Sequence, residues 1–368
     1  MRTIVDRTMQ VLRRGVTPVT LCAVMLGLLG VLAVFNASYH LSASHRYALR
    51  QGLWLTVGAL AVVGAAGLPA GVYRRWGPWF IGPGYLALVG VLVWGIRIRR
   101  MQGWYSFPGF LVQPGELVKP LFVLSLALLA VHTARFRESF VRGYTPWLAV
   151  LAAWIVPLAL QPDFGMVLVH VGAFLAVSVV AGVPLRHMSL GLLGGIPLAV
   201  FAWLRVDYLR TRVMSFLNPE QFAESAGWHV LQFRRTLASG GLLGRSWGDC
   251  VWARTHLPLG HTDSMFATIG EAMGFLGVLP LVVLLVAWCA YVCQRSRQVD
   301  APFAALTAVG LMALVMVQSL IHLSVNLGLM PVTGLTLPLF SYGGSSMVST
   351  MLCVGMSESL LRASPGRV

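Results

Sequence analysis

The sequence contains few charged residues: Asp, Glu, Lys and Arg make up 11% of its 368 residues, whereas hydrophobic residues make up 57%. A soluble domain usually carries about a quarter charged residues. The shortage of charge excludes a soluble enzyme, and the large hydrophobic fraction excludes an intrinsically disordered chain.

Lysine and acidic residues are the scarcest charged types. The chain has 12 acidic residues against 27 basic ones, and Lys119 is the one lysine, so the net charge is +15. In a soluble protein this surplus would suggest nucleic-acid binding, but in a hydrophobic protein cytoplasmic loops and anionic lipids explain it first. We therefore expect a membrane-embedded protein with no nucleic-acid partner.

Cysteine is too sparse for a disulfide framework, because only Cys250 of the five cysteines falls in an expected external loop. Cys289 and Cys293 share a helix face. No His or acidic ligand lies near them in the sequence, so this spacing favours packing over metal binding.

Long apolar runs dominate what remains. A membrane-spanning helix needs roughly 20 apolar residues. The arginine-rich N-terminus precedes a run that is too long for a signal peptide, which indicates an uncleaved first span. Ten such runs lie near residues 16–36, 50–72, 77–96, 114–134, 145–161, 164–183, 188–205, 266–294, 302–325 and 340–361. The expected fold is an all-α polytopic integral membrane protein of ten transmembrane helices, forming a single domain over residues 1–368.

The arginines predict the orientation. With the N-terminus inside, 14 arginines fall in cytoplasmic segments and five in short external loops. The other seven lie in the segment of about 205–265 between helices 7 and 8, and long loops are largely exempt from the positive-inside rule. The chain is therefore expected to be N-in and C-in, with this large loop outside.

Two motifs place charge at the edge of apolar runs. In Gln113-Pro-Gly-Glu116-Leu-Val-Lys119 the i, i+3 spacing puts Glu116 and Lys119 on one helix face, where they can pair. A structural ion pair and a substrate contact are equally compatible with this motif. In Gln161-Pro162-Asp163, the aspartate precedes an apolar run, so helix capping is its leading role and substrate or metal contact the second.

The long loop and the start of the next run carry most of the remaining polar candidates. Asp263 stands just before an apolar run, and spacing alone favours a helix cap for it. The run Ser239-Gly-Gly-Leu-Leu-Gly244 is typical of turns. The other candidates are Arg210, Arg212, Gln232, Arg245, His261 and Glu271.

A further segment, residues 326–346, contains two breaks rich in Pro and Gly at membrane depth and ends in Ser341-Tyr342-Gly-Gly-Ser345. Lipid cannot satisfy backbone groups that are freed from a helix. The pattern therefore predicts a broken or re-entrant segment beside a functional cavity.

These motifs together resemble the SEDS family (shape, elongation, division and sporulation), the RodA, FtsW and SpoVE type. The matching stretches, in order, are QPGELVK, QPDFG, RVMSFLNPE with GWHVLQ and SGGLLG, HTDSMFATIGEAMGFLG, and PVTGLTLPLFSYGGSS. They extend from about residue 104 to the C-terminus. Five ordered motifs are far more specific than any one of them.

The resemblance implies a peptidoglycan glycosyltransferase that polymerises lipid II at the outer face of the bacterial cytoplasmic membrane. Asp263 matches the family's essential acidic residue, and Trp104 matches a family tryptophan that precedes the QPGELVK motif. The family also implies a divalent cation, Mg²⁺ or Mn²⁺, and a class B penicillin-binding protein as transpeptidase partner. The sequence does not decide between cell-wall elongation and division.

The residues fit this chemistry. An acceptor sugar hydroxyl needs a general base, while a pyrophosphate leaves with little need for an acid, so one carboxylate suffices. Guanidinium groups suit a pyrophosphate. The candidates are Arg210, Arg212, Arg234, Arg235 and Arg245, followed by Arg99 and Arg100.

The chain departs from the family pattern at several positions, which bear on donor and acceptor binding more than on the fold, and two other functions stay open beside the polymerase. Gly115, Met166 and Ala272 replace the usual residues, and WGDCVWARTHL before residue 258 departs most. A lipid II flippase is the first alternative, because Glu116, Lys119 and Asp163 lie in the membrane region. A non-catalytic scaffold for a penicillin-binding protein is the second.

Overall fold

The computed structural model describes residues 2–39, 44–98, 101–224, 227–257 and 260–363. Arg99, Arg100 and Arg367, which belong to the predicted arginine sets, lie outside these ranges.

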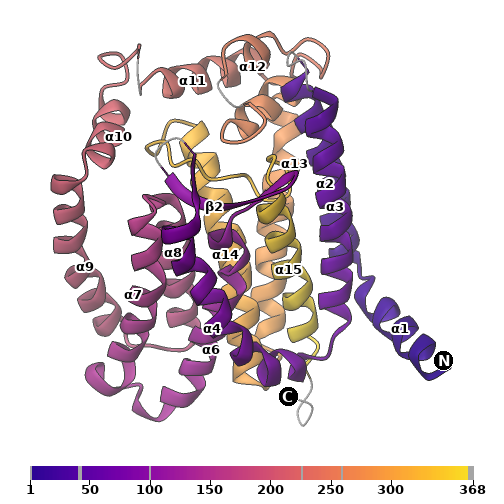
Figure 1. The fold of residues 1–368 in the computed structure, drawn as a ribbon, viewed down its shortest axis with the longest axis vertical. Coiled ribbons are helices and arrows are strands. Elements are labelled where there is room, and N and C mark those ends of the chain that lie inside the picture. Colours follow the sequence, from indigo (N-terminus) through magenta and orange to yellow (C-terminus); the bar gives the residue numbers. More distant parts are fainter. Residues whose placement is uncertain (1, 40–43, 99–100, 225–226, 258–259, 364–368) are drawn as a thin grey trace.

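Most of the described chain is helical, and every predicted apolar run contains a helix (Figure 1). Eight helices of the described part are long and apolar enough to cross a membrane, whereas α8 and α15 have 17 residues each. The helices within the runs are α2 (Pro18–Ser38), α3 (Ser44–Gly67), α4 (Ala70–Trp94), α5 (Pro114–Leu117), α6 (Lys119–Thr133), α7 (Thr145–Leu160), α8 (Phe164–Val180), α9 (Leu185–Arg205), α13 (Met265–Ser296), α14 (Pro302–Asn326) and α15 (Gly344–Leu360).

The bundle is built around α14. This helix is buried along most of its length and packs against α6, α8, α13 and α15. In contrast, α9 stands at the edge of the bundle, and among its residues only His187 and Met188 are buried (Figure 1). A short N-terminal helix, α1 (Arg2–Gly15), projects from the end that also holds the C-terminal end of α15. A short 3-10 turn (Ala134–Phe136) and a π-helical turn (Phe140–Tyr144) connect α6 to α7.

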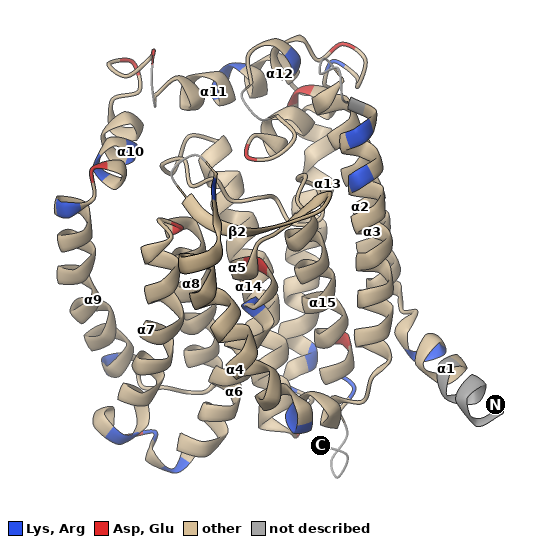
Figure 2. Ribbon diagram, in the orientation of Figure 1, with Lys and Arg blue, Asp and Glu red and all other residues tan. Residues whose placement is uncertain are grey.

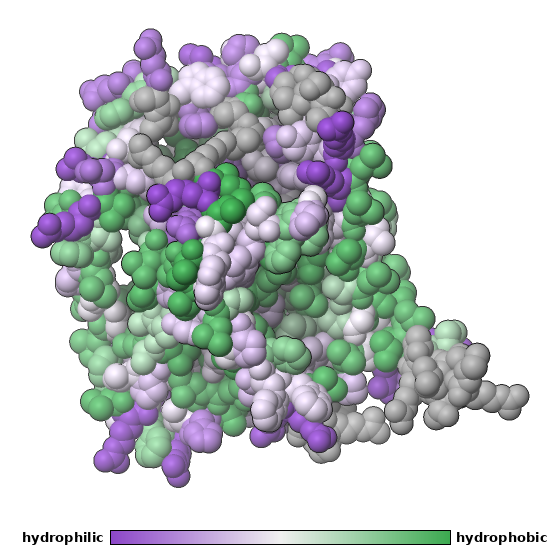
Figure 3. Space-filling model, in the orientation of Figure 1, coloured by the Kyte–Doolittle hydropathy of each residue, from purple (hydrophilic) through white to green (hydrophobic). Residues whose placement is uncertain are grey.

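The surface of the bundle is apolar in its middle and more polar at its two ends (Figure 3). Figure 2 shows most basic residues toward the two ends of the bundle, and Figure 3 shows a predominantly hydrophobic band between more hydrophilic ends. Large apolar side chains such as Leu60 of α3, Trp79 of α4 and Leu198 of α9 are exposed. An apolar band of this kind is what contact with lipid requires.

The all-α prediction is wrong for residues 96–112. This stretch forms a three-stranded antiparallel sheet of β1 (Ile96–Ile98), β2 (Met101–Phe107) and β3 (Phe110–Val112), in the order β1-β2-β3. The stretch from Ile96 to Ile98 alternates apolar and charged side chains, which is the period of a strand with one face packed and the other exposed.

The long segment of about 205–265 carries three short helices that form an arch over one end of the bundle (Figure 1). They are α10 (Asp207–Leu217), α11 (Trp228–Gly240) and α12 (Val251–Thr255). The Arg254 guanidinium ties the arch to the bundle: it donates to Asn36 Oδ1 of α2 at 2.9 Å and to the carbonyls of Trp247 and Gly248 at 2.9 and 2.7 Å.

Helix α13 is interrupted at Gly274, where the turn after α11 docks. Gly274 has φ 66° and ψ −177°, a conformation that is accessible essentially to glycine alone. The N–H groups of Phe275 and Leu276 donate to the carbonyls of Gly241 and Leu242 at 2.9 and 3.1 Å. The glycine-rich run 239–244 thus contains the end of α11 and the predicted turn, which covers residues 241–243 and fixes the arch to α13.

Three buried polar residues, Gln318, His322 and Asn326, form a stripe on one face of α14 at i, i+4 spacing. Gln318 Nε2 donates to the Thr336 carbonyl at 3.1 Å, and His322 Nδ1 lies 2.8 Å from the Leu335 carbonyl. The stripe therefore supports the non-helical segment 327–343, which confirms the predicted break before α15.

The same stripe caps α13. The N-cap residue Ser264 makes no side-chain capping bond, so the first N–H groups of this helix need other acceptors. The N–H groups of Phe266 and Ala267 donate to His322 Nε2 at 3.4 Å and to Asn326 Oδ1 at 3.1 Å. Helix α14 thereby holds the segment that precedes α13 in place.

Replacing Gly274 by alanine is expected to destabilise the protein. A Cβ there would lie 2.3 Å from the Gly244 nitrogen and would strain the backbone, at a cost of about 2 kcal/mol. We expect a lower melting temperature for the detergent-solubilised protein. The control is Gly64→Ala in α3, where nothing lies within 4 Å of the added Cβ and alanine is the better helix former. Equal melting temperatures for both variants would contradict this role.

Replacing Asn326 by leucine is expected to release the start of α13. The change leaves the Ala267 N–H without its acceptor, a loss of about 1–3 kcal/mol, so amide hydrogen exchange over residues 265–268 should accelerate about tenfold or more. The matched control is Ser319→Ala, because this buried hydroxyl bonds only to its own helix at the Val315 carbonyl, 2.8 Å away. Exchange that is unchanged in Asn326→Leu would rule out capping by α14.

Candidate functional site

Asp263 lies at the end of the bundle that the arch covers, immediately before Ser264 and α13. Its carbonyl accepts a hydrogen bond from Asn326 Nδ2 at 3.1 Å, and the residue is half-buried. Its carboxylate faces the broken segment, since a Cβ built on Gly334 would lie 3.9 Å from Asp263 Oδ2. The N-cap residue of α13 is Ser264, so the prediction that spacing made for Asp263 as the cap is wrong by one residue.

The residues before Asp263 are paired with the end of the broken segment. The Tyr342 N–H donates to the His261 carbonyl at 2.7 Å, and Ser341 Oγ donates to the Thr262 carbonyl at 2.7 Å. The buried His261 ring lies 5.9 Å from that of Tyr342 and 4.8 Å from that of Tyr47. These contacts join two predicted motifs that are almost 80 residues apart in the sequence.

Arg212 of α10 brings a cation to the same place. Its Nη1 donates to the Val332 carbonyl in the broken segment, and its guanidinium lies 4.2 Å from the centre of the Tyr208 ring. Burial lowers the pKa of Arg212 below its ordinary value, while Tyr208, Asp263 and Asp163 act to raise it. The two aspartates are thus close enough to stabilise this charge, and an arginine stays protonated in such surroundings.

Asp163 is the N-cap of α8, which confirms its predicted capping role. Its Oδ1 accepts from the Met166 N–H at 3.0 Å, and its Oδ2 accepts from Gln113 Nε2 at 3.3 Å. The Gln113 N–H donates in turn to Ser345 Oγ at 2.9 Å. The QPGELVK, QPDFG and SYGGSS motifs therefore meet at one point.

Glu116 and Lys119 form the predicted ion pair, with Lys119 Nζ 2.5 Å from Glu116 Oε2 and both residues buried. Lys119 Nζ also donates to Gln318 Oε1 at 2.6 Å, and Gln318 Nε2 donates to Glu116 Oε1 at 3.3 Å and to Thr336 Oγ1 at 3.1 Å. The pair thus supports the broken segment from the bundle interior.

Glu271 and Arg245 stabilise the arch through hydrogen bonds. The fully buried Glu271 carboxylate accepts from the N–H groups of Trp252 and Ala253 at 3.0 and 2.7 Å, and from Ser239 Oγ at 3.0 Å. It therefore caps α12. Arg245 is exposed, and its Nε donates to the Ser239 carbonyl at 2.8 Å. Both side chains bond within the arch and its junction with α13.

The other predicted residues make contacts elsewhere in the arch and the sheet. Arg210 forms an exposed ion pair with Asp207 at 3.2 Å on α10. Trp104 lies on β2 opposite Ile96. Gln232 is buried in α11, and its Oε1 has no hydrogen-bond partner among the described residues. Arg234 donates to the Gly328 carbonyl at 3.4 Å, and Arg235 is exposed on α11.

Sequence reasoning missed four residues that hold this site together. They are the α14 stripe and Gln51, whose Nε2 donates to the Ser341 carbonyl at 3.1 Å and whose Oε1 accepts from the Gly343 N–H at 3.3 Å. The signal was available for the stripe, because Gln318, His322 and Asn326 recur every four residues inside an otherwise apolar run. Gln51 gave no such signal, as it stands alone at the start of a run.

The described residues offer no ready metal centre. Within them, no group of three or more His, Cys, Asp or Glu side chains is placed to hold a metal ion. Asp163 and Asp263 approach the same guanidinium, and the Met166 N–H and Gln113 Nε2 each donate to one oxygen of Asp163. These side chains do not form a protein-only ligand set for a divalent cation.

The chain is similar to known proteins over nearly its whole length. Residues 17–364 match the model of the FtsW, RodA and SpoVE family, described as cell cycle protein. Stage V sporulation protein E of Bacillus subtilis is 30% identical over 352 residues, covering 91% of this chain and 94% of that protein. The probable peptidoglycan glycosyltransferase FtsW of Thiomicrospira cyclica is 32% identical over 349 residues, covering 92% of this chain and 88% of that protein.

Solved structures show the same fold. A chain from a study of how a peptidoglycan synthase complex coordinates polymerization and crosslinking matches with a TM-score of 0.74 and 29% identity, covering 92% of this chain and 96% of that one. The rod shape determining protein RodA of Thermus thermophilus matches with a TM-score of 0.66 and 27% identity, covering 92% of this chain and 95% of that one. The chain therefore belongs to the FtsW, RodA and SpoVE family, the SEDS family that its motifs predict, and is a multi-pass protein of the bacterial inner membrane.

Proposed function

We propose that the protein is a peptidoglycan glycosyltransferase that transfers the growing glycan strand onto lipid II at the outer face of the cytoplasmic membrane. The observation that carries this proposal is the meeting of Asp263, Arg212 and the broken segment beneath the arch. A carboxylate beside a half-buried guanidinium suits a reaction that removes one proton and releases one pyrophosphate. Relatives that carry the name peptidoglycan glycosyltransferase support the assignment.

The proposed topology has ten spans with both termini in the cytoplasm. Helices α8 and α15 would cross as part of the bundle although they are short, because polar segments at their ends are buried by protein. The start of the chain and the end of α15 lie at the end of the bundle opposite the arch, which supports placing the arch outside (Figure 1). The 14 arginines of the predicted cytoplasmic segments agree with this orientation.

Asp263 acts as the general base in the proposed reaction. Its carboxylate takes the proton of the acceptor GlcNAc hydroxyl as that oxygen attacks the anomeric carbon of the donor MurNAc. The new glycosidic bond forms, the bond from the anomeric carbon to the pyrophosphate oxygen breaks, and the electron pair leaves with the lipid pyrophosphate. Arg212 lies where it can stabilise the negative charge that develops on the leaving group.

A lipid-linked substrate needs access from the bilayer, and α9 leaves room for it. Only the first turn of this helix, with His187 and Met188, is buried, and the rest stands away from the bundle below the arch. Gaps are visible beside it in the space-filling view (Figure 3). A lipid tail beside α9 would remain in the membrane while its headgroup reaches Asp263.

The proposed partner is a class B penicillin-binding protein that supplies the transpeptidase. The solved structure from a peptidoglycan synthase complex supports an assembly of this kind. A divalent cation, Mg²⁺ or Mn²⁺, is proposed from the family resemblance alone. The side chains described around Asp263 do not by themselves form a ligand set for it.

The flippase alternative needs a polar path through the bundle to the cytoplasm. The interior charges that suggested such a path, Glu116 and Lys119, are buried and bonded to Gln318 and to each other. The arrangement supports the polymerase over both the flippase and the non-catalytic scaffold, since it gives these charges a structural role and places Asp263 with a cation.

Asp263→Asn is expected to abolish polymerisation of labelled lipid II by the purified protein together with its penicillin-binding partner. The amide cannot accept the hydroxyl proton, so the rate should fall by about a hundredfold to ten-thousandfold. The control is Glu138→Gln, an exposed carboxylate that pairs with Arg186 at the other end of the bundle. An Asp263→Asn protein that polymerises at the wild-type rate would refute the general-base role and favour a scaffold.

Arg212→Gln is expected to reduce kcat/KM for lipid II by about tenfold to a hundredfold, because one cation facing the leaving group is lost. Arg210→Gln removes the same charge two residues away but affects only an exposed ion pair, so its kcat/KM should stay within about twofold of wild type. Equal losses in both variants would show that α10 contributes only general positive potential.

A further inference from the structure

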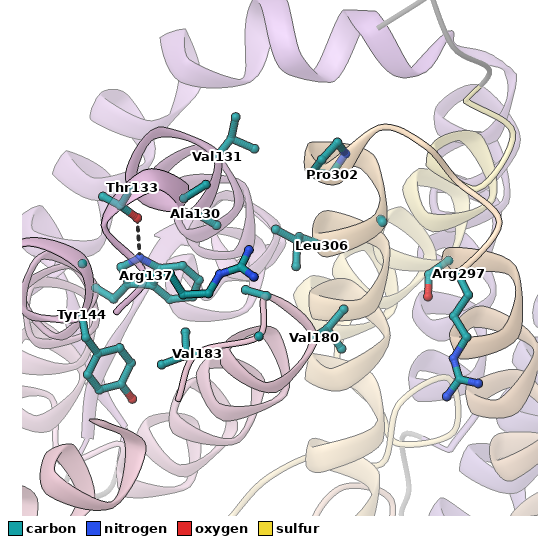
Figure 4. Close-up of a pocket in the computed structure, with 17 residues that line it drawn as sticks. Ala130, Val131, Thr133, Arg137, Tyr144, Val180, Val183, Arg297, Pro302 and Leu306 are labelled. Carbon is teal, nitrogen blue, oxygen red and sulfur yellow. Dashed lines mark hydrogen bonds between the residues drawn. The ribbon is translucent and has the colours of Figure 1, made fainter. Parts of the chain in front are cut away.

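A cavity lies where α6, α8 and α13 end, at the end of the bundle opposite the arch (Figure 4). It has a volume of about 440 Å³, which is within the usual range for small-molecule sites. The ends of α6, α8 and α13, the start of α14 and the connection between α6 and α7 enclose it. None of the residues assigned to polymerisation lines it.

Arg137 supplies the charge inside this cavity. Figure 4 shows its guanidinium directed toward Val180 and Leu306. The guanidinium passes over Gly182, where a Cβ would lie 3.1 Å from Arg137 Nη1, and the φ of +71° there favours glycine. The backbone at residue 182 therefore leaves space for the arginine to lie in the cavity.

Arg137 is the cation directed into the cavity. Arg297 lies on the opposite rim with its guanidinium directed away from Arg137, and no Asp or Glu is among the described lining residues (Figure 4). Two acidic residues lie near the lining residues in the sequence, but neither lines the cavity. Glu138 pairs with Arg186 at 3.1 Å, and Asp300 is not among the lining residues. Helix α14 begins at Pro302 in the lining and presents the positive end of its dipole, whereas α6, α8 and α13 end at the cavity and present the negative ends of theirs. The positive charge in the cavity therefore comes from the Arg137 guanidinium and not from the helix dipoles.

The remaining lining is largely apolar and partly open to the membrane side. Val131 and Val180 are 38% and 47% exposed, so the cavity continues onto the lipid-facing surface. On its inner side, Trp147 is buried and its Nε1 donates to Thr133 Oγ1 at 3.0 Å. A ligand that fits must carry an anion at one end and a hydrocarbon chain at the other.

We propose that this cavity binds the headgroup of an acidic phospholipid, with the phosphate on Arg137 and an acyl chain along Val131 and Val180. The choice of leaflet rests on the proposed topology, which places the cavity at the cytoplasmic side, where anionic lipids attract basic segments. The lipid would join α6, α8 and α14 at the end remote from the reaction and so stabilise the bundle around α14.

Native mass spectrometry of the detergent-solubilised protein tests the site with phosphatidylglycerol as the probe. We expect a retained phosphatidylglycerol adduct on the wild type, and a dissociation constant raised about five- to tenfold in Arg137→Gln. The control is Arg135→Gln, which removes the same charge two residues away, where the guanidinium lies over the Phe136 ring and does not line the cavity. A second variant, Ala305→Leu, should also weaken the adduct by filling the cavity.

Two further ligands identify the source of the phosphate. Phosphatidylcholine should bind more weakly than phosphatidylglycerol, and millimolar inorganic phosphate should not displace the lipid. Equal phosphatidylglycerol binding by Arg137→Gln and Arg135→Gln would overturn the site, and displacement by inorganic phosphate would overturn its assignment to a lipid. Since the readout is binding, a failed polymerase assay leaves this test unaffected.

Discussion

The capping of α13 by α14 is the interaction on which the geometry of the candidate site depends. A helix that starts inside the bundle has N–H groups that neither lipid nor its own turns can satisfy. His322 and Asn326 supply the missing acceptors, and Asn326 also binds the Asp263 carbonyl. The same hydrogen bonds that make the start of α13 tolerable therefore fix the position of the proposed catalytic aspartate.

This solution places polar groups in an apolar bundle, which is stable only if each finds a partner. Gln318 meets this condition by bonding to both members of the buried Glu116–Lys119 pair and to Thr336. Breaking such a pair would leave one uncompensated charge in the interior. The ion pair is thus most simply understood as the inner support of the broken segment, while the outer end of that segment faces Asp263.

Much of this arrangement was predictable from the sequence, and the exceptions have physical reasons. Local signals gave the apolar helices, the Asp163 cap, the Glu116–Lys119 pair and the break before α15, because each depends on neighbouring residues. The hydrogen bonds from Gln51 to the broken segment join residues about 290 positions apart, so no local pattern indicates them. The sheet at 96–112 was not predicted, because its strands are short and stand between apolar runs that gave the stronger helical signal.

The site around Asp263 and helix α9 differ in how tightly they are packed, and the difference suits an enzyme that acts on a lipid-linked substrate. Around Asp263, main-chain bonds join segments distant in sequence, such as those from Tyr342 to His261 and from Ser341 to Thr262. A base that must meet a substrate hydroxyl benefits from this rigidity. In contrast, α9 is buried only at its first turn, so the flank beside the site can admit a substrate without disturbing α14. A rigid site beside a loosely packed helix can hold the reacting sugar in place while the lipid that carries this sugar remains in the membrane.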